Sequence, residues 1–537
     1  MLRKIKKIPG FIRGLKKIKD VEHRLSASFK EKHHLTPVAA PLVLVQCVED
    51  PYYFGLFGQI VSSLRVDGPV RAEQFVLRSA NVGEADSWGK FIGLRLVLNK
   101  ILNQKWTRLY SSFCDDVAYQ CSGWDFSIAD FIDLFRAHSA WKSLSNAASL
   151  ERLEIRGIPV GDLVNDTFLR FKPAPTVDIE DKYLFLIIWQ AYCDVRRAHN
   201  YFSNSKVNLY LTSYSTYIQH GIPVRIALRA GVKVFSFGNY QEFSKQLSTQ
   251  DWMHTKEASA YAKEFSLLDN PSEKLTLADK KLSARLAGAT DAATAYMKES
   301  AYREIEKLTV DVNGAVVIFL HDFFDSPNVY YNMVFSDFWQ WACFTIEALE
   351  KARVPFVIKP HPNQVGLSGE VLHDLMRRYP DACFISSKIT NKQLVDGGVI
   401  CAVTAYGTVS HEMAYLGVPS VTCARHPHIA FDFCVTATNR VEYGEALASC
   451  LSLLPDKPKL TRESLVFYYM HNLNYGTDEC QFLDAVSVFR KRCADAESGD
   501  VDMDFPDELG RISEMPGFQT WIAKWHQILG DPPRIIS

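Results

Sequence analysis

The stretch that decides the fold is Val399 to Cys423, which reads VICAVTAYGTVSHEMAYLGVPSVTC. The apolar run from Val399 to Val403 is typical of a strand buried on both faces, and small residues follow it where a helix should begin. Gly417 and Pro419 end that helix before a second strand. This order of strand, turn, helix and strand predicts one unit of a parallel α/β sheet.

The turn in this stretch also predicts an anion site. Unpaired backbone N–H groups at the start of a helix attract a phosphate, and Gly407 lets the backbone come close. The hydroxyl groups of Thr404, Thr408 and Ser410 can donate further hydrogen bonds, and Glu412 can accept them from sugar or ribose hydroxyls. An ordinary serine-rich helix start would look similar, because the stretch lacks both G-x-G-x-x-G and the lysine of a P-loop.

A second apolar run, residues 354–358, ends in the sequence Lys359-Pro360-His361-Pro362-Asn363. The run predicts a strand whose carboxyl end presents a cation and an imidazole. Ligands bind at this edge in open α/β sheets. The carboxyl ends of two strands of one sheet both suit phosphate, which predicts a nucleotide-bearing ligand. Lys359, His361 and Asn363 are expected among its contacts.

These motifs resemble the donor-binding half of GT-B glycosyltransferases that build bacterial surface polysaccharides. The resemblance lies in Lys-Pro-His-Pro at 359–362 and in Thr-x-x-Gly-Thr-x-x-x-Glu-x-x-x-x-Gly-x-Pro at 404–419. It is closest to the capsule and O-antigen Kdo transferases, and more distant to CDP-glycerol polymerases and nucleotide-sugar 2-epimerases. Residues 321–327 are similar to the His-x-Phe-x-Asp-x-Pro segment of the Kdo-transferase-like proteins, and the resemblance is strong over 311–435.

The resemblance implies an α/β fold of GT-B type, with two Rossmann-like domains facing a cleft and C-terminal helices that cross back. It implies an enzyme without cofactor or metal that moves a sugar from a nucleotide-sugar to a glycan or lipid-linked acceptor. The favoured donor is CMP-Kdo, with retention of configuration. The alternatives are a transferase of the same fold with a UDP-, GDP- or CDP-linked donor, and an inactive GT-B scaffold in an assembly complex.

Such a reaction develops positive charge at the sugar carbon and negative charge at the leaving phosphate, so side chains that stabilise these charges are the candidate catalytic groups. A carboxylate can stabilise the oxocarbenium-like carbon or attack it, and Asp325 is the predicted group. Asp322 could equally cap the next helix. His321 and His361 are the predicted acid/base or phosphate groups, because imidazoles titrate near neutrality.

Bulk properties exclude several classes of protein. The net charge of -1 argues against nucleic acid as a partner. No apolar run approaches the length of a membrane span and no signal peptide is visible, so we expect a cytoplasmic protein. The 12 cysteines lie singly and are predicted to be reduced and buried. The acidic run 500–504 is predicted to be a solvated loop rather than a metal site.

The length of 537 residues predicts more than one core. We expect a basic amphipathic segment (1–25), an N-terminal Rossmann-like acceptor domain (38–275), a helical connection (276–310), a Rossmann-like donor domain (311–455) and C-terminal helices (456–537). Strands are predicted at 41–47, 207–212 and 232–237 in the first domain and at 315–320 in the second. The Trp- and Phe-rich helical region 125–153 is predicted to be core.

Residues 1–20 combine basic residues with apolar residues at every third or fourth position. Such a helix can bind anionic lipid at the inner leaflet, which would make the protein peripheral on the inner membrane. Pro9-Gly10 would interrupt the helix. A packing or disordered basic tail is the alternative.

Two groups of residues are candidates for the acceptor side. Asp162 and Asp166 share one helical face and could act in catalysis there; alternatively, Asp162 caps a helix and Asp166 pairs with a nearby arginine. Tyr217, His220 and Arg225 follow the predicted strand 207–212 and could bind the acceptor or sugar. Arg225 could bind a sugar carboxylate through a bidentate hydrogen bond from its guanidinium. His220 could equally have a structural role.

Overall fold

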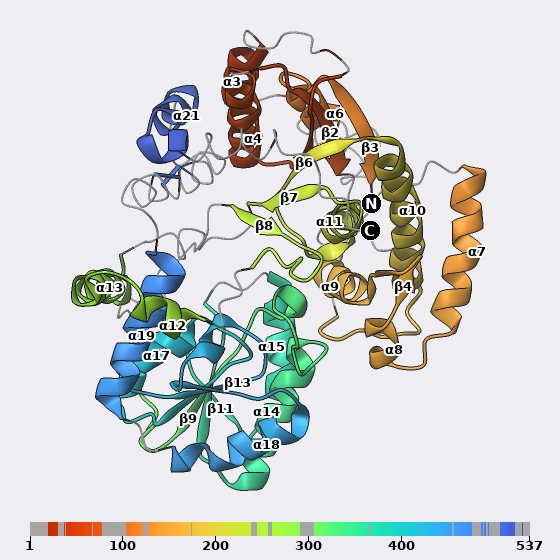
Figure 1. The fold of residues 1–537 in the computed structure, drawn as a ribbon. Coiled ribbons are helices and arrows are strands. Elements are labelled where there is room, and N and C mark those ends of the chain that lie inside the picture. Colours follow the sequence, from red (N-terminus) through yellow and green to blue (C-terminus); the bar gives the residue numbers. More distant parts are fainter. Residues whose placement is uncertain are drawn as a thin grey trace. The chain divides into compact units, whose positions relative to one another are not determined.

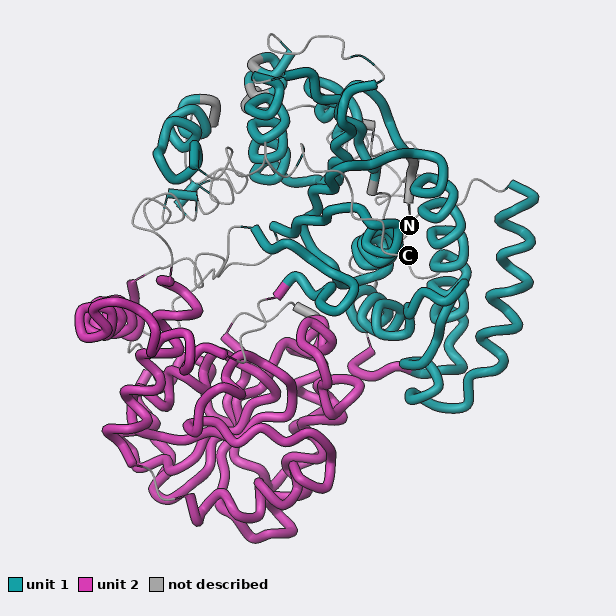
Figure 2. Tube along the Cα trace, viewed as in Figure 1, with its two compact units in different colours: residues 1–172, 178–254, 475–537 teal, residues 173–177, 255–474 magenta. Residues whose placement is uncertain are grey.

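A computed structural model gives the fold of the chain (Figure 1). It describes residues 20–30, 37, 39–66, 68–77, 104–121, 127–172, 174–237, 244–255, 260–289, 306–362, 366–453 and 456–474, with parts of 485–529. Contacts divide the chain into two compact units (Figure 2). Unit 1 takes in Met1–Lys172, Asp178–His254 and Tyr475–Ser537, and unit 2 takes in Pro173–Val177 and Thr255–Asn474.

Unit 1 is built on a sheet with the strand order β3-β2-β1-β6-β7-β8. Its strands are β1 (Leu42–Cys47), β2 (Arg71–Leu77), β3 (Asp116–Cys121), β6 (Val207–Thr212), β7 (Lys233–Ser236) and β8 (Lys245–Leu247). Neighbouring strands run parallel, except that β8 is antiparallel to β7. Every residue of β1 is buried, as expected for a strand whose sheet carries helices on both faces.

Helices connect the parallel strands of unit 1. They are α3 (Asp20–Lys30), α4 (Pro51–Leu64), α6 (Gln104–Tyr110), α7 (Ile128–Lys142), α8 (Ala147–Glu151), α9 (Gly161–Phe171), α10 (Lys182–Asn204), α11 (Tyr217–Arg229) and α21 (Phe505–Ser513). A short antiparallel pair, β4 (Glu154–Ile155) and β5 (Ile158–Pro159), lies between α8 and α9. Asp50 shows how the sequence starts a helix, since its carboxylate accepts from Tyr52 N at 2.7 Å with Pro51 at the first position of α4.

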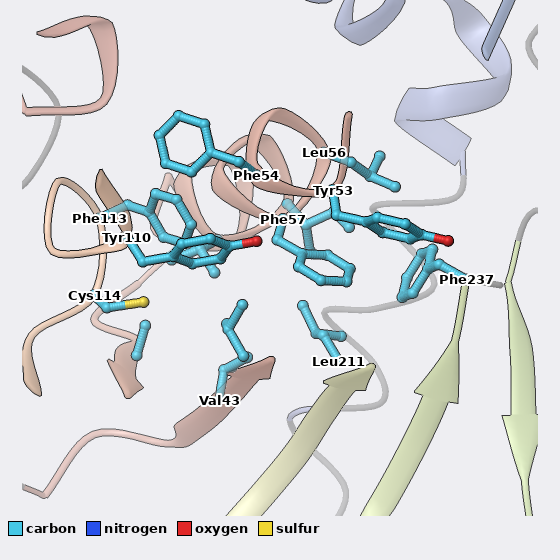
Figure 3. Packing of buried hydrophobic residues seen from close by; sticks show 14 of the residues in the cluster. Val43, Tyr53, Phe54, Leu56, Phe57, Tyr110, Phe113, Cys114, Leu211 and Phe237 are labelled. Carbon is cyan, nitrogen blue, oxygen red and sulfur yellow. The ribbon is translucent and has the colours of Figure 1, made fainter. Parts of the chain in front are cut away.

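Aromatic side chains of α4 occupy the centre of the main apolar cluster of unit 1 (Figure 3). Phe54 lies edge-on to Tyr110 at 5.3 Å between ring centroids, and Phe57 meets Phe237 at 5.4 Å. Val43 of β1 belongs to the same cluster. Each such ring buries roughly 150–250 Å². The cluster therefore seats α4 on the sheet beside the carboxyl ends of its central strands.

Unit 2 is built on a second parallel sheet, with the strand order β11-β10-β9-β12-β13-β14. Its strands are β9 (Val316–Phe319), β10 (Phe356–Lys359), β11 (Cys383–Phe384), β12 (Cys401–Val403), β13 (Ser420–Thr422) and β14 (Cys434–Thr436). Its helices are α12 (Tyr261–Ser266), α13 (Pro271–Leu286), α14 (Phe338–Ala352), α15 (Gly366–Arg378), α16 (Asn391–Asp396), α17 (Val409–Tyr415), α18 (Arg440–Ser449) and α19 (Lys457–Asn472). Apolar side chains fill both faces of this sheet, in two separate clusters.

The predicted fold class is confirmed: the chain is an α/β protein with two Rossmann-like sheets. The predicted strands appear as β1, β6 and β7 in unit 1 and as β9, β10, β12 and β13 in unit 2. The C-terminal segment 475–537 belongs to unit 1, where α21 contacts α3 and α4. α19 stays in unit 2 and packs against α13 and α17. The region 276–310 was predicted as a connection, but the contacts of α13 place that helix within unit 2.

The prediction that 125–153 is core is wrong for the outer face of α7. Ile128 is 82% exposed and Phe135 is 74% exposed. The residues that α7 buries are Asp130, Asp133 and Ala137. The apolar spacing was taken to indicate burial, but the buried side of the helix is the one that carries Asp130 and Asp133. Predicted segment 1–20 lies outside the described residues, except for Asp20.

A search of the described helices finds none that is long and apolar enough to cross a membrane.

Gly161, at the start of α9, offers a test of the packing of unit 1. A Cβ at this position would overlap the backbone carbonyl oxygens of Leu150 and Glu151, which cannot rotate away. We expect Gly161→Ala to lower the free energy of unfolding by about 1–3 kcal/mol, the usual cost of overpacking. Thermal unfolding measures this change. Gly68→Ala is the control, because nothing lies within 4 Å of its added Cβ; equal melting temperatures for the two variants would contradict the predicted contact.

Candidate functional site

The strand order of unit 2 creates a switch point beside β9. The chain passes from β9 to β10 on one side, and β12 lies on the other side of β9. Connections from β9 and β12 therefore leave the sheet in opposite directions, which opens a crevice at their carboxyl ends. The loops that follow β9, β10 and β12 carry most of the residues predicted to bind the donor.

His321 and Thr404 meet at this switch point. Nε2 of His321 and Oγ1 of Thr404 share a hydrogen bond of 2.9 Å, although the residues are 83 positions apart. The same Oγ1 accepts from the backbone N–H of Gly407 at 3.2 Å. A Cβ on Gly407 would come within 2.8 Å of that oxygen, so only glycine fits the turn as it stands. Two predicted motifs are thus joined into one structure.

The ring of His321 is held on all sides. It stacks on Phe338 with 4.6 Å between centroids and 3° between planes, and it lies edge-on to Trp341 at 5.8 Å. Burial and, to a smaller extent, the nearby His361 together lower the pKa of His321 to about 3. The imidazole is therefore neutral at physiological pH and positions Thr404 rather than carrying charge.

Asp322 and Asp325, the two carboxylates of this loop, have different environments. Asp322 is buried and accepts from Phe324 N at 3.0 Å and from Ser368 Oγ at 2.6 Å. Asp325 is exposed, and its Oδ1 accepts from Ser326 N at 2.9 Å. Asp322 thus shapes the turn but does not cap the next helical element, whose N-cap is Ser326. Asp325 is the accessible carboxylate.

Lys359 and Glu412 are placed inside unit 2 rather than at its edge. Lys359 is 4% exposed and donates to Asn391 Oδ1 at 3.2 Å. Asn391 donates in turn to Glu412 Oε2 at 3.0 Å, and Arg285 lies 3.7 Å from the other oxygen. Burial lowers the pKa of Lys359 to about 8, partly offset by Glu412. This network links buried charges of both signs and supports the start of α17 from behind.

The start of α17 differs from the predicted helix in its length. α17 has 7 residues, and Thr408 caps it without a side-chain hydrogen bond. Ser410 is fully buried, and its hydroxyl lacks a hydrogen-bond partner among the described residues. Gly407 and Thr408 are the accessible residues of this turn. Asn363 lies outside the described residues.

Unit 1 has its own switch point between β1 and β6. Gln46, at the end of β1, accepts from the backbone N–H of Ser213 at 2.9 Å and from its hydroxyl at 2.6 Å. Ser215 Oγ accepts from His254 N at 2.8 Å and lies 3.3 Å from Nδ1 of that histidine. Sequence reasoning missed Gln46 and His254, because one sits in an apolar strand and the other far along the chain.

Tyr217 and His220 lie beside this second switch point. Tyr217 has a φ of +63°, a conformation that costs energy in a residue other than glycine. Its ring is 6.5 Å from that of His220, which in turn is 6.0 Å from Tyr214. Burial lowers the pKa of His220 to about 3, so the ring is neutral. Backbone strain and a partly buried, neutral imidazole thus coincide at the predicted acceptor residues.

Asp162 and Arg225 face each other in the structure. Arg225 NH1 donates to Asp162 Oδ1 at 2.8 Å and to the carbonyl of Pro159 at 2.7 Å, and NH2 donates to Asp162 Oδ2. Burial raises the pKa of Asp162, but Arg225 more than offsets this effect and holds the pKa below its usual value. The guanidinium fork predicted for a sugar carboxylate holds Asp162 instead. Asp166 is 1% exposed within α9.

A cluster of buried histidines beside β13 was not predicted. It consists of His411, His426, His428 and His471. The rings of His426 and His428 are 3.8 Å apart, and Phe467 lies 4.6 Å from His428. Burial lowers the pKa of His426 to about 3 and that of His428 well below its usual value. Neither ring nitrogen of His428 has a hydrogen-bond partner among the described residues.

This cluster predicts a loss of stability in acid. The unfolded chain binds a proton at each histidine below about pH 6.5, whereas folded His428 stays neutral. The contribution of His428 to the free energy of unfolding is therefore fully present above that pH and decreases as the pH falls. The free energy of unfolding of the wild type should therefore rise with pH in this range. We expect His428→Leu to reduce that slope by about 1.4 kcal/mol per pH unit between pH 6 and 4. Hydrogen exchange of β12 and β13 amides measures it, with exposed His373→Leu as the control; an unchanged slope would show that His428 is protonated in the folded state.

Groups of three or more His, Cys, Asp or Glu side chains that could hold a metal ion were sought among the described residues, and none was found.

Comparisons with known proteins were made for sequence and for structure. No protein-family model matches the chain, and no curated protein matches it. Among solved structures, it is similar to a UDP-N-acetylglucosamine 2-epimerase from Listeria monocytogenes, with 9% identity, a TM-score of 0.25 and coverage of 87% of this chain and 98% of that one.

Two further solved structures are similar to a comparable degree. One is a UDP-GlcNAc 2-epimerase from Neisseria meningitidis bound to UDP-GlcNAc, with 9% identity, a TM-score of 0.23 and coverage of 85% of this chain and 99% of that one. The other is a Phytolacca americana UGT2 complexed with UDP-2-fluoro-glucose and pterostilbene, with 10% identity, a TM-score of 0.25 and coverage of 91% and 100%. At these values the function has to be argued from the site itself.

Proposed function

We propose that the chain is a glycosyltransferase that binds a nucleotide-sugar at the carboxyl edge of the unit 2 sheet. The observation that carries this proposal is the hydrogen bond between His321 and Thr404, which joins the loops after β9 and β12 at the switch point. Open α/β sheets bind their ligands at such points. Accessible side chains on or next to the joined loops include a hydroxyl, an imidazole and a carboxylate, from Thr408, His361 and Asp325.

The donor phosphates would lie against Gly407 and Thr408. Gly407 is partly exposed in this turn, and a glycine has no side chain that would keep a phosphate from its backbone. Thr408 is exposed and offers a hydroxyl. His361 is half-buried after β10 and close enough to influence the pKa of His321. Its imidazole would donate a hydrogen bond to the departing phosphate.

The reacting sugar carbon would lie near Asp325. Tyr406 OH donates to the carbonyl of Ser326 at 2.7 Å, which ties the loop after β12 to the loop after β9. Asp325 and Gly407 are the immediate sequence neighbours of these two residues. An exposed carboxylate is therefore held beside the proposed phosphate position, where it can stabilise an oxocarbenium-like carbon.

The acceptor would be a glycan or lipid-linked sugar at the switch point of unit 1. Tyr217 and His220 are the residues we retain there, because a strained backbone and a partly buried imidazole coincide at this edge. Asp162 and Arg225 are not included among the acceptor-binding residues, because their side chains form an ion pair with each other. Buried Asp166 is left out as well.

CMP-Kdo is the donor that we favour, on the motif resemblance of residues 321–327 and 359–362. Donors linked to UDP, GDP or CDP fit the same phosphate contacts, because these contacts do not distinguish the base or the sugar. Peripheral attachment to the inner membrane also belongs to this proposal, through the acceptor.

Nucleotide binding tests the site directly. We expect one of CMP, UDP, GDP and CDP to raise the melting temperature by about 5–10 °C at a hundredfold excess over Kd. His361→Ala should lose most of this shift, while the exposed His373→Ala keeps it. A shift in melting temperature with CMP alone supports CMP-Kdo as the donor. A shift with another nucleotide instead assigns the donor to a sugar linked to that nucleotide. If all four nucleotides leave the melting temperature unchanged, the scaffold alternative is favoured.

Asp325→Asn tests the chemical step. The variant should bind the nucleotide as tightly as the wild type but release it from the matching nucleotide-sugar at least about 100-fold more slowly, because the carboxylate charge is lost. Product nucleotide is measured by chromatography. Asp381→Asn, at an exposed position of the same unit, is the control. Wild-type turnover by Asp325→Asn would exclude this carboxylate from catalysis.

A further inference from the structure

The outer face of α7 carries a stripe of apolar side chains. Ile128, Phe131, Ile132 and Phe135 are 82%, 47%, 47% and 74% exposed. Their spacing of three and four residues places them on one side of the helix over two turns. Elsewhere among the described residues, large exposed apolar side chains occur at most one to a helix or strand. This group is therefore a surface feature of its own, which we call the α7 stripe.

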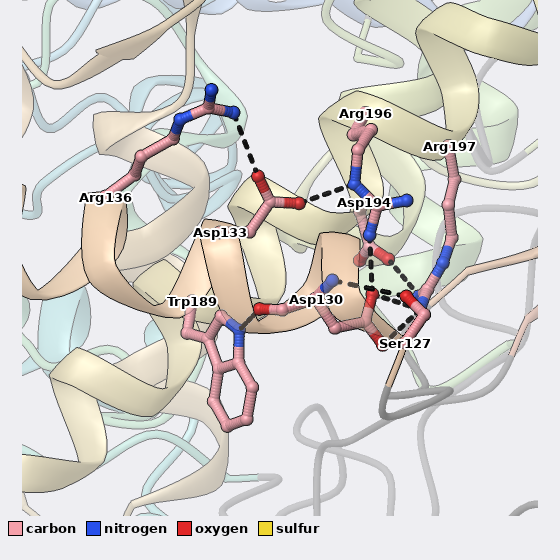
Figure 4. Close-up of polar contacts among 8 residues, drawn as sticks. All are labelled: Ser127, Asp130, Asp133, Arg136, Trp189, Asp194, Arg196 and Arg197. Carbon is pink, nitrogen blue, oxygen red and sulfur yellow. Dashed lines mark hydrogen bonds and ion pairs between the residues drawn. The ribbon is translucent and has the colours of Figure 1, made fainter.

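The inner face of α7 is charged. Asp130 lies 2.5 Å from Arg196 and 3.1 Å from Arg197, and Asp133 lies 2.6 Å from Nε of Arg196 (Figure 4). The indole of Trp189 also donates to the carbonyl of Asp130 at 2.8 Å. α7 is thus held to α10 by ion pairs and hydrogen bonds at positions where a surface helix normally buries apolar residues.

This reversal is costly for folding alone. Buried ion pairs contribute no more than well-packed apolar side chains of similar volume, and often less. α7 has four large apolar side chains that could have packed against α10, yet they face outward. Folding of unit 1 does not explain this orientation, whereas contact with an apolar partner does.

The charges exposed on α7 indicate the nature of that partner. Both carboxylates of the helix are buried, and its exposed charged residues are Arg136 and Lys142. Nζ of Lys142 lies 4.2 Å from the ring of Trp141, near the end of the helix. An apolar stripe bordered by cations is typical of a helix that lies in an anionic membrane interface.

The size of the stripe favours a lipid surface over a second copy of the chain. Four side chains over eight residues span about 11 Å of helix. At roughly 150 Å² each they offer less than the ~800 Å² per partner of a standard interface. An interfacial helix needs only a shallow apolar face.

We propose that α7 attaches unit 1 to an anionic lipid surface, with the α7 stripe among the acyl chains and Arg136 and Lys142 at the headgroups. Figure 1 shows α7 beside α10, with no helix or strand of unit 1 drawn on its far side. The ion pairs hold the helix in the orientation that presents the stripe. This proposal is independent of the donor site and of residues 1–20.

Vesicle sedimentation of the full chain tests the proposal. We expect the wild type to bind phosphatidylglycerol-rich vesicles and to bind pure phosphatidylcholine at least fivefold less, since each interfacial cation contributes about fivefold. Phe131→Ser with Phe135→Ser should weaken binding to the anionic vesicles at least tenfold. The control is Leu267→Ser with Val441→Ser, which removes two apolar side chains elsewhere that are 76% and 70% exposed. Circular dichroism checks that both double variants remain folded.

Three results would overturn the proposal. The first is absence of vesicle binding by the wild type. The second is equal binding by the α7 variant and its control, which would assign any attachment to another segment. The third is a dimer in lipid-free solution that dissociates when the α7 stripe is substituted, which would make a second copy of the chain the partner.

Discussion

The order of strands in unit 2 is the constraint on which the candidate site depends. β9 lies between β10 and β12, so that loops from distant parts of the sequence leave the sheet at one place. The hydrogen bond between His321 and Thr404 joins the loops after β9 and β12, and Gly407 completes the turn because a larger residue would displace the threonine. Stacking on Phe338 and burial keep the imidazole neutral and fixed. The accessible groups, His361, Thr408 and Asp325, owe their positions to this arrangement.

Buried charge plays two different roles in the molecule. In unit 2, Lys359, Asn391 and Glu412 form a satisfied network behind α17, so these charges support the site without being presented to a ligand. In unit 1, Asp130 and Arg196 orient α7 and leave its apolar side outward. Both arrangements replace apolar packing with paired polar groups, which specify one orientation at little gain in stability.

The sequence predicted backbone features more reliably than side-chain partners. Apolar, β-branched runs bounded by turn residues located β9, β10 and β12, because local composition determines such strands. The loops at their carboxyl ends could be grouped, because parallel strands bring those ends together. Partners were not predictable: Arg225 holds Asp162, 63 positions away, and both lie in helices whose contact depends on the whole unit. The exposed apolar face of α7 was missed because apolar residues at helical spacing were assumed to be buried, and the spacing alone does not show which side of a helix faces the core.

Hydrogen–deuterium exchange with and without a saturating nucleotide tests the central claim, that the donor binds at the unit 2 switch point. The account predicts slower exchange in the loops after β9, β10 and β12, at residues 320–332, 360–362 and 404–410. It predicts no change in β14, the edge strand of that sheet, which is separated from β12 by β13. Slower exchange confined to the loops after β1 and β6 of unit 1, with unit 2 unchanged, would contradict the account.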